Sequence, residues 1–443
     1  MGARISRPFQ NACFIDTRCQ SARVLAASRG FDYNCEMANA LTALFTRRML
    51  SVFLLGFSSG LPLLLIGSTL KAWMTEEKID LGTVGLFALV QLPYSLKFLW
   101  APLLDRYTLP LLDRRRGWIL VFQLALMVSI FAISFFHPAT DLKSLTIACV
   151  FVAFFAASQD IAIDAYRREV LRDEEQGLGA SFGVNGYRIG MLVAGAGALA
   201  LAQFLSWEAS YRIMGIGMGV AIFATLLAPS VKGDVLAPRN LTEAVVQPFL
   251  EFFSRGFAVE VLVFILLFKL GDQMASDMFN PFYIQMGYTK AEIAAISKVF
   301  GLWATIAGGF LGGLCLVRYS LKSCLWVFGS LQIVSTLGFS WLATFIGPNL
   351  GALTTVVTVE NLCSGLGSAA YVAFMALLTD RRFTATQYAL LSSLMSVPRI
   401  FFGSSTGYLA QAMGWTPYFV FCAAIGLPGL LMLVRFPKWT KTQ

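Results

Sequence analysis

Charged side chains are scarce in this sequence: they make up 13% of its 443 residues, whereas hydrophobic residues make up 57% and the mean hydropathy is +0.68. So few charged groups cannot cover the surface of a soluble globule of this size. The hydrophobic residues form continuous runs instead of the alternating pattern of a membrane β-strand, which argues against a barrel. The composition therefore favours an all-α integral membrane protein, because helices satisfy their own backbone in lipid.

Histidine is rare, and closely spaced cysteine pairs are absent from the sequence. The sequence has a single histidine, His137, and eight cysteines without a C-x-x-C pair, so we expect neither a metal site nor a disulfide. These residues offer no nucleophile and base set, which argues against a membrane enzyme such as an acyltransferase. The phosphate-binding pattern GxxxxGK[ST] is absent, so we expect no ATP site and no cofactor.

What the sequence has instead is a series of long apolar runs. A helix that crosses a bilayer needs about 20 mostly apolar residues, and twelve runs approach or exceed that length. The expected spans are 50–73, 82–104, 117–136, 144–166, 179–204, 210–229, 258–281, 291–316, 323–345, 351–379, 384–411 and 416–434.

The basic residues predict how these spans are oriented. If the N-terminus is cytoplasmic, the inside segments hold 24 of the 34 Lys and Arg residues, and the outside loops hold three. Cytoplasmic loops are enriched in Lys and Arg, so we expect both termini in the cytoplasm. The net charge of +9 then reflects membrane topology and not nucleic-acid binding.

The chain divides into two parts of six expected spans each. Residues 49–230 and 258–436 form the two six-helix bundles, and 231–257 form a cytoplasmic linker with an interfacial helix at 241–253. Arg188-Ile189 and Arg399-Ile400, each followed by glycines, echo one another in the fifth and eleventh spans. Such repeats are typical of transporters whose halves move about a central cavity.

Both ends of the chain are expected to be cytoplasmic tails. Residues 1–48 are polar and rich in arginine. We expect them to be disordered, or to be upstream sequence read from an early start codon, with Met37 or Met49 as the alternative start. Residues 437–443 form the second tail.

A charged motif follows the second expected span. It begins with Asp105-Arg106-Tyr107 and ends with Arg114-Arg115-Arg116. This resembles the signature between spans 2 and 3 of the major facilitator superfamily, with a longer spacer. The resemblance implies a cytoplasmic gate of Asp105, Arg106, Arg114 and Arg115, in which the acid binds basic residues and the positive end of a helix in span 11. The alternative is a charge cluster that only fixes topology.

Further stretches resemble the AmpG-type muropeptide permeases, and the resemblance covers residues 50–435. They are Gly-Leu-Pro-Leu at 60–63 with Trp-Met at 73–74, Lys-Phe-Leu-Trp-Ala-Pro-Leu-Leu-Asp-Arg-Tyr at 97–107, Ala-Ser-Gln-Asp-Ile-Ala-Ile-Asp-Ala at 157–165, Lys-Leu-Gly-Asp at 269–272, Glu-Asn-Leu-Cys-Ser-Gly-Leu-Gly at 360–367 and Ala-Thr-Gln-Tyr-Ala-Leu-Leu-Ser at 385–392. The chain departs from this family in its N-terminal tail and in lacking the additional helices that some members carry.

The resemblance implies a multi-pass protein of the bacterial inner membrane that imports anhydromuropeptides (GlcNAc-1,6-anhydro-MurNAc and its peptides). Import would be driven by the proton gradient and would feed peptidoglycan recycling and, through it, β-lactamase induction. The implied partners are an amphiphilic sugar-peptide substrate and the lipid bilayer, with no obligate protein partner and no nucleic acid. The alternative is another carrier on the same fold, such as an acyl-coenzyme A transporter or a drug/proton antiporter.

Ionisable residues within the spans are the candidate site, because a charge at membrane depth usually faces a cavity or a partner. Asp160 and Asp164 are four residues apart and share a helix face. We predict that they pair with Lys97 and Arg188 in a network that lines the inner cavity, and that one of the two carboxylates carries the proton. The alternative is a purely structural salt bridge between spans 2, 4 and 5.

The predicted substrate site draws on both bundles. Basic residues would meet substrate carboxylates, amides would meet hydroxyl groups, and an aromatic ring would stack on a sugar. The predicted substrate-binding residues are Tyr94, Lys97, Gln159, Arg188, Lys269, Asp272, Glu360, Asn361 and Arg399. Trp73, Tyr187 and Tyr371 are further candidates for stacking on a sugar.

Overall fold

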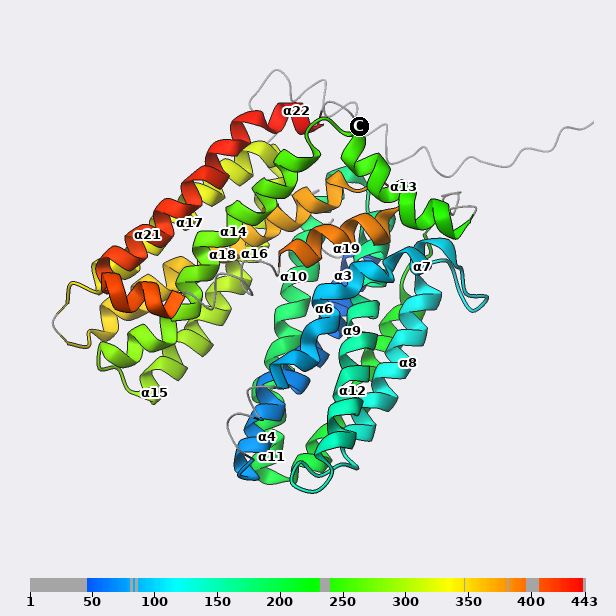
Figure 1. Cartoon of the computed structure of the whole chain (residues 1–443), viewed down its shortest axis with the longest axis horizontal. Coiled ribbons are helices and arrows are strands. Elements are labelled where there is room, and N and C mark those ends of the chain that lie inside the picture. Colours follow the sequence, from blue (N-terminus) through cyan, green and yellow to red (C-terminus); the bar gives the residue numbers. More distant parts are fainter. Residues whose placement is uncertain are drawn as a thin grey trace, which may run out of the picture. The chain divides into compact units, whose positions relative to one another are not determined.

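The computed structural model describes residues 46–79, 83, 87–231, 240–345, 347–380, 382–395 and 406–440. All the elements named here belong to one compact unit, Arg47–Gln443. The described residues are helical or lie in turns and loops (Figure 1). We call residues 47–231 the first half and residues 258–440 the second half.

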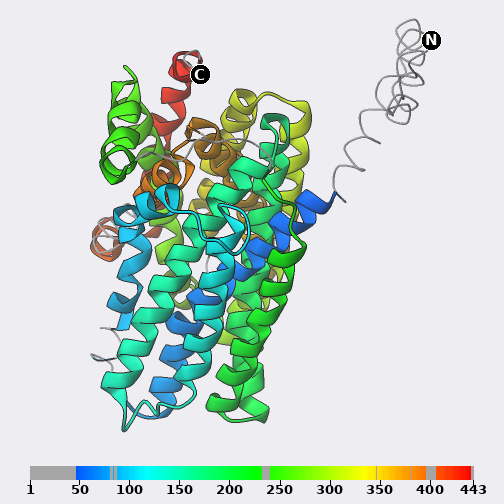
Figure 2. The same cartoon turned by 90° about the vertical axis from the view of Figure 1, so that its right-hand side faces the viewer.

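The first half consists of long helices joined by short loops. Two of its long helices contain a π turn, marked η1 and η5. Its elements are α3 (Arg47–Leu64), η1 (Leu65–Thr69), α4 (Leu70–Glu76), η2 (Phe87–Gln91), α6 (Leu92–Leu96), η3 (Lys97–Leu99), α7 (Ala101–Arg106), α8 (Arg116–Ile133), α9 (Leu142–Val170), η4 (Asp173–Glu175), α10 (Gln176–Leu192), η5 (Val193–Gly197), α11 (Ala198–Phe204) and α12 (Trp207–Leu227). Helix α8 runs alongside both α9 and α12 (Figures 1 and 2).

Helix α13 (Leu241–Ser254) lies between the halves in sequence, and the second half follows it. The second half contains α14 (Ala258–Gln285), α15 (Lys290–Ile293), η6 (Ala294–Phe300), α16 (Gly301–Arg318), α17 (Leu321–Leu342), α18 (Leu350–Leu378), α19 (Thr384–Leu394), α21 (Trp415–Met432), η7 (Leu433–Arg435) and α22 (Phe436–Thr440). Residues 406–413 are helical as well.

Within the described residues, nine helical segments are long and apolar enough to cross a membrane. Three of the twelve expected spans are not among them. Helix α14 is long enough, but it carries several charged residues, including Lys269 and Asp272. The span expected at 384–411 is described only in part, because residues 396–405 lie outside the described residues.

The span expected as one continuous helix at 82–104 is broken into the short elements η2, α6, η3 and α7. That expectation was wrong for residues 87–104. Pro93 and Pro102 stand at the first turns of α6 and α7. Because proline has no backbone N–H and clashes with the preceding turn, each marks a helix start and not a helix interior. Because of these breaks, Lys97 lies in η3 and Asp105 lies in α7.

Glycines allow pairs of helices to pack very closely. A Cβ added to Gly56 of α3 would lie 2.2 Å from the carbonyl oxygen of Gly183 in α10. In the second half, a Cβ on Gly365 of α18 would lie 2.3 Å from the carbonyl oxygen of Thr305 in α16. Backbones this close are typical of membrane helices packed through small residues. The contacts fix α10 and α18, which carry several of the predicted site residues.

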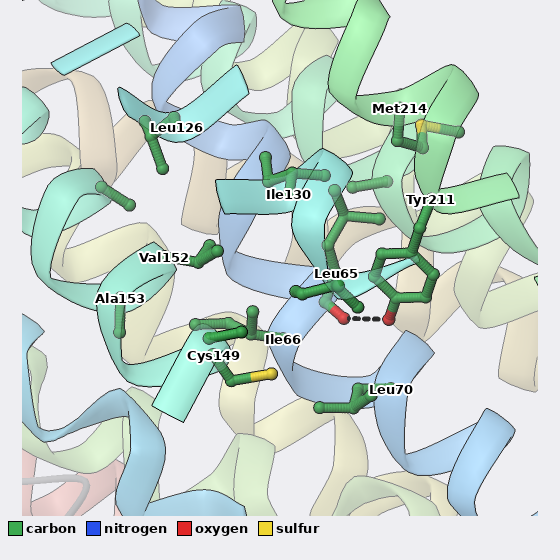
Figure 3. Packing of buried hydrophobic residues seen from close by; sticks show 14 of the residues in the cluster. Leu65, Ile66, Leu70, Leu126, Ile130, Cys149, Val152, Ala153, Tyr211 and Met214 are labelled. Carbon is green, nitrogen blue, oxygen red and sulfur yellow. Dashed lines mark hydrogen bonds between the residues drawn. The ribbon is translucent and has the colours of Figure 1, made fainter. Parts of the chain in front are cut away.

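The hydrophobic core of the first half surrounds the kink in the first long helix (Figure 3). Gly67 departs from helical backbone angles there, and the hydroxyl group of Tyr211 donates to the carbonyl oxygen of Leu65 at 2.7 Å. Ile130, Val152 and other apolar side chains pack around this bond. The Leu65 carbonyl group beside the kink therefore has a hydrogen-bond partner within an apolar environment.

Candidate functional site

Asp105, at the end of α7, binds the first turn of α19 in the other half. Its side chain is 0% exposed. Its carboxylate accepts hydrogen bonds from the backbone N–H groups of Ala385 (3.2 Å) and Thr386 (2.8 Å), and from the Thr386 hydroxyl (2.7 Å). The first N–H groups of a helix have no partner within the helix and carry partial positive charge, so a carboxylate there is strongly favoured.

Arginines complete this buried network. Arg115 Nη2 lies 2.7 Å from Asp105 and 2.5 Å from Glu169, and its Nη1 donates to the Leu104 carbonyl at 3.0 Å. Arg114 donates to the backbone carbonyls of Asp105 (2.8 Å) and Arg382 (3.3 Å). We call Asp105, Arg114, Arg115, Glu169 and Thr386 the Asp105 interlock. Arg106 is separate from it, with its guanidinium over the ring of Tyr107.

Both interlock arginines keep their charge at neutral pH. Burial lowers the pKa of Arg114 to about 10, and repulsion from Arg115 adds to the effect. Burial alone would also lower the pKa of Arg115, but the carboxylates of Glu169 and Asp105 outweigh it and raise that pKa. These two arginines are therefore charged over the whole physiological range of pH.

Helix α13 binds the same end of the second half. Glu251 accepts from Gln387 Nε2 of α19 at 2.5 Å and from Arg255 Nη2 at 2.7 Å. Arg255 also donates to the Leu378 carbonyl at the end of α18, at 2.7 Å. Gln387 follows Thr386 in sequence, so the start of α19 is held both by α7 and by α13.

A cavity of about 280 Å³ lies between the two halves, and it contains the two predicted carboxylates, Asp160 and Asp164. Asp164 forms an ion pair with Arg167 at 3.2 Å, one turn further along α9. Arg167 also donates to the hydroxyl of Tyr388 in α19 at 2.8 Å. The lining residues include Leu55, Gly56 and Ser59 of α3, Asp160, Asp164 and Arg167 of α9, Tyr187 of α10, Val372 of α18, and Tyr388 and Ser392 of α19.

The surroundings of Asp160 contain polar atoms without partners. Asp160 lies within hydrogen-bond reach of Ser59 and in the electrostatic field of Lys97 and Asp164. No ion pair within 4.0 Å joins Asp160 to Lys97, two residues that the structure describes in full. One oxygen of Asp160 and the hydroxyl of neighbouring Tyr94 are buried without a hydrogen-bond partner among the described residues. This cluster thus has unused capacity to bind a proton or a ligand.

Gln159 is adjacent in sequence but turns to a different side of α9. It is completely buried, and its Nε2 donates to the Ser58 hydroxyl at 3.0 Å. It is not among the residues that line the 280 Å³ cavity. In this conformation Gln159 helps to hold α3 against α9, and its predicted contact with substrate is not formed by the cavity that the structure describes.

A second group of charges lies in the second half. Lys269 Nζ donates to Asp272 at 3.2 Å and to the side-chain oxygen of Gln332 at 3.1 Å. Glu360, which is 5% exposed, contacts the carboxyl group of Asp272. Gln332 Nε2 is buried and has no hydrogen-bond partner among the described residues. We call Lys269, Asp272, Gln332 and Glu360 the Lys269 cluster.

Arg188 belongs with this second group and not with Asp160. It extends from α10 to the Thr305 carbonyl (2.9 Å) and the Ser368 hydroxyl (3.4 Å), both in the second half. Asp272 and Glu360 are the carboxylates whose field it feels. The predicted network of Asp160, Asp164, Lys97 and Arg188 must be corrected in this respect, because α10 directs Arg188 across to α16 and α18.

Two further predicted residues are Asn361 and Arg399. Asn361 is bonded within the second half, accepting from the Thr305 hydroxyl (2.8 Å) and donating to the Val357 carbonyl (2.9 Å). Arg399 lies outside the described residues. Within the described part of the chain, no group of three or more His, Cys, Asp or Glu residues could hold a metal ion.

The family model of the Major Facilitator Superfamily matches residues 49–403 of the chain. The chain belongs to the major facilitator superfamily. The fold agrees with this, because it is similar to the proton:xylose symporter XylE bound to 6-bromo-6-deoxy-D-glucose, with a TM-score of 0.69 and 11% identity, covering 88% of this chain and 95% of that one. A human organic anion transporter, MFSD10, is similar at a TM-score of 0.64 and 14% identity, covering 87% of this chain and 99% of that one.

Relatives with higher sequence identity to this major facilitator chain are named as permeases or transporters. The anhydromuropeptide permease of Escherichia coli (strain K12) is 44% identical over 385 residues, 86% of this chain and 78% of that protein. A protein of Rickettsia felis named "Putative transporter AmpG 4" is 37% identical over 88% of this chain and 97% of that one. The expected family and the all-α major facilitator fold are confirmed, and these relatives are transporters and not enzymes.

Several residues of this major facilitator site were not predicted from the sequence. They are Ser59, Arg167, Glu169, Gln332 and Tyr388, which contact the predicted residues directly. Tyr388 lies within the family-like stretch 385–392, and Arg167 follows Asp164 at helical spacing, so both carried a detectable signal. Trp73 and Tyr371 are fully buried. Trp73 stacks on Trp207, and the Tyr371 hydroxyl donates to Ile265, so neither ring is free to stack on a sugar.

Proposed function

We propose that this protein is a proton-coupled importer of anhydromuropeptides across the bacterial inner membrane. The observation that carries the proposal is the 44% identity over 385 residues to the anhydromuropeptide permease of Escherichia coli. The cavity between the halves, with two carboxylates in its wall, supports transport of a polar solute. In the cell, import would supply peptidoglycan recycling and, through it, β-lactamase induction.

The direction of transport depends on orientation, which we infer from the basic residues. With both termini in the cytoplasm, the Asp105 interlock stands at the cytoplasmic end. Asp105, Arg114 and Arg115 would then form a cytoplasmic gate that joins the halves by binding α19. Substrate reaches the cytoplasm when this contact breaks, as in other carriers built from two repeats.

We assign the proton role and the substrate role to different residues. Asp160 is the first candidate for the proton, because its carboxylate lies in the cavity with one oxygen unpartnered among the described residues. Asp164 is already paired with Arg167 and would act nearer the gate. Lys97, Arg188 and Lys269 do not line this cavity in the conformation described, and we propose that they meet substrate carboxylates during transport. The membrane potential adds about 2.3 kcal/mol per transported charge per 100 mV.

Uptake of radiolabelled GlcNAc-anhydro-MurNAc by permease-deficient bacteria tests the proposal. Cells that express this protein should accumulate the label, and an uncoupler should reduce accumulation to the level of equilibration. Cells with an empty vector provide the baseline. No uptake by a correctly inserted protein would refute the substrate, whereas uptake that resists the uncoupler would refute only the proton coupling.

A further inference from the structure

Two carboxyl groups touch inside the second half. Glu360 of α18 contacts Asp272 of α14, and Glu360 is 5% exposed. Two carboxylates at hydrogen-bonding distance repel each other unless one proton lies between them, as in other acid pairs. The pair is therefore suited to bind one proton, in a different place from Asp160.

The charges around this pair nearly balance. Lys269 donates to Asp272, and Arg188 reaches the same region from the first half. Among the described residues, the other titratable groups in the field of Glu360 are Tyr283 and Cys363, whose ordinary pKa values lie above physiological pH. With both carboxylates ionised, the formal charges of Lys269, Arg188, Asp272 and Glu360 cancel. One added proton leaves a net charge of +1.

Donors for an anion lie beside neighbouring residues of α18, Gln332 next to Gly367 and Arg188 next to Ser368. Gln332 is 5% exposed, and its amide oxygen accepts from Lys269 while its Nε2 has no partner among the described residues. Arg188 is bonded to the neutral oxygens of Thr305 and Ser368. It makes no ion pair within 4.0 Å with Asp272 or Glu360, all three being residues that the structure describes. Both groups can therefore donate to a ligand without breaking an ion pair.

We propose that the Lys269 cluster and Arg188 bind one proton and one substrate carboxylate together. The proton forms an O–H bond on the Asp272–Glu360 pair, and the carboxylate then neutralises the remaining positive charge through Arg188 and Gln332. This inference rests on the proposed function, because it assumes a substrate that carries a carboxylate. It gives the second half a proton site of its own and makes proton and anion binding mutually dependent. Because Arg188 comes from the first half, the bound anion would also connect the halves.

The test uses the full-length protein in detergent and begins without substrate. Infrared difference spectra between acid and alkaline pH should contain the C=O stretch of a protonated buried carboxyl group, and part of this band should be missing in both Glu360→Gln and Asp272→Asn. Asp141→Asn, at an exposed loop carboxylate, should leave the band unchanged. A wild-type band that neither cluster variant alters would overturn the inference while leaving the transport function intact.

The second stage measures binding of GlcNAc-anhydro-MurNAc and of its neutral methyl ester by calorimetry. For the acid, wild-type affinity should fall by up to roughly tenfold per pH unit once the pair has lost its proton, and binding should take up protons. The methyl ester should bind without this pH dependence. Glu360→Gln, a mimic of the protonated pair, should bind the acid with little pH dependence and take up fewer protons.

Each outcome separates the inference from the proposed function. Unchanged pH dependence and unchanged proton uptake in both Glu360→Gln and Asp272→Asn would overturn the inference although the substrate is correct. Wild-type protein that binds neither compound at any pH would refute the proposed substrate and the carboxylate role of the cluster. In that case the infrared band would still report whether the pair holds a proton.

Discussion

The Asp105 interlock and the Lys269 cluster are both buried groups of opposite charges, yet they are completed to different degrees. Asp105 accepts from two backbone N–H groups, a hydroxyl and two arginines, which uses both of its oxygens. Its partner Arg114 still has two buried nitrogens, Nε and Nη1, without a hydrogen-bond partner among the described residues. In the Lys269 cluster, Gln332 has an unused donor within the described structure, and Glu360 meets another carboxyl group. A buried carboxylate whose two oxygens are both partnered fixes one arrangement, whereas two carboxyl groups that meet are suited to accept a proton.

The difference also has an energetic side. Removing one partner from a complete buried ion network leaves an uncompensated charge and costs about 3–5 kcal/mol. In an incomplete network, the same change removes less existing stabilisation, so its main effect should be on binding. Comparing stability with transport in matched variants therefore distinguishes a residue that holds the halves together from one that acts on the substrate or the proton.

The largest effect is expected for Asp105→Ala. The change removes the partner of the α19 N-terminus and leaves Arg115 with the Glu169 carboxylate and the Leu104 carbonyl, at a cost of about 3–5 kcal/mol to the contact between the halves. The cavity should open toward the cytoplasm. A Ser392→Cys reporter in the cavity wall should then react with a membrane-impermeant maleimide in inside-out vesicles at least tenfold faster than in the parent.

Asp141→Asn provides the matched control, because this exposed carboxylate is remote from the interlock in sequence and contacts only its own loop. It should leave the labelling rate unchanged. If Asp105→Ala labels no faster than this control while remaining folded, Asp105 does not hold the two halves together.

A smaller loss of stability but a large loss of coupling is expected for Asp160→Asn. Asparagine keeps the size of the side chain and cannot release a proton, so uphill accumulation should fall strongly, and any remainder would come from the proton site of the Lys269 cluster. Exchange of labelled for unlabelled substrate should persist. Uptake in proteoliposomes with and without a pH gradient measures both activities.

Asp164→Asn is the companion to this variant, since the two carboxylates lie in the same cavity and, among the described residues, only Asp164 has an ion pair, at 3.2 Å to Arg167. It should retain gradient-driven accumulation at a reduced rate. Full accumulation and full uncoupler sensitivity in Asp160→Asn would exclude Asp160 as the proton carrier. Loss of coupling only in Asp164→Asn would move the role to that residue.

The sequence predicted the interlock better than it predicted the polar groups inside the membrane. The position of Asp105 after an apolar run, and the resemblance of its motif to a known signature, pointed to a contact with span 11 before any geometry was known. The structure places Asp105 against Ala385 and Thr386 at the start of α19. Contacts of this kind can be predicted because both partners stand at helix ends, and the sequence marks where helices end.

Arg188 is the opposite case. Its depth in the membrane matched that of Asp160, so sequence reasoning grouped the two residues. Which face of α10 carries Arg188 depends on the packing of Gly183 and Gly186 against α3, and that packing turns position 188 toward Thr305 in the second half. Depth can be counted along a sequence, whereas helix rotation is decided by tertiary contacts that the sequence does not display.

The smallest effect is expected for Tyr388→Phe, which removes a single hydroxyl from the contact between the halves. Arg167 Nη2 loses an acceptor at 2.8 Å, but it retains Asp164 at 3.2 Å and keeps its position over the ring at 5.3 Å. A hydrogen bond to a charged group contributes about 1.5–3 kcal/mol, and the remaining partners should reduce the loss to about 1 kcal/mol. Maleimide labelling of Ser392→Cys should therefore rise about fivefold, less than with Asp105→Ala.

Tyr107→Phe removes the same atom from an exposed ring and should leave the rate unchanged. A rate in Tyr388→Phe equal to that of Tyr107→Phe would show that Arg167 and Tyr388 do not contribute to closure, and a rate equal to that of Asp105→Ala would show that they contribute as much as the interlock.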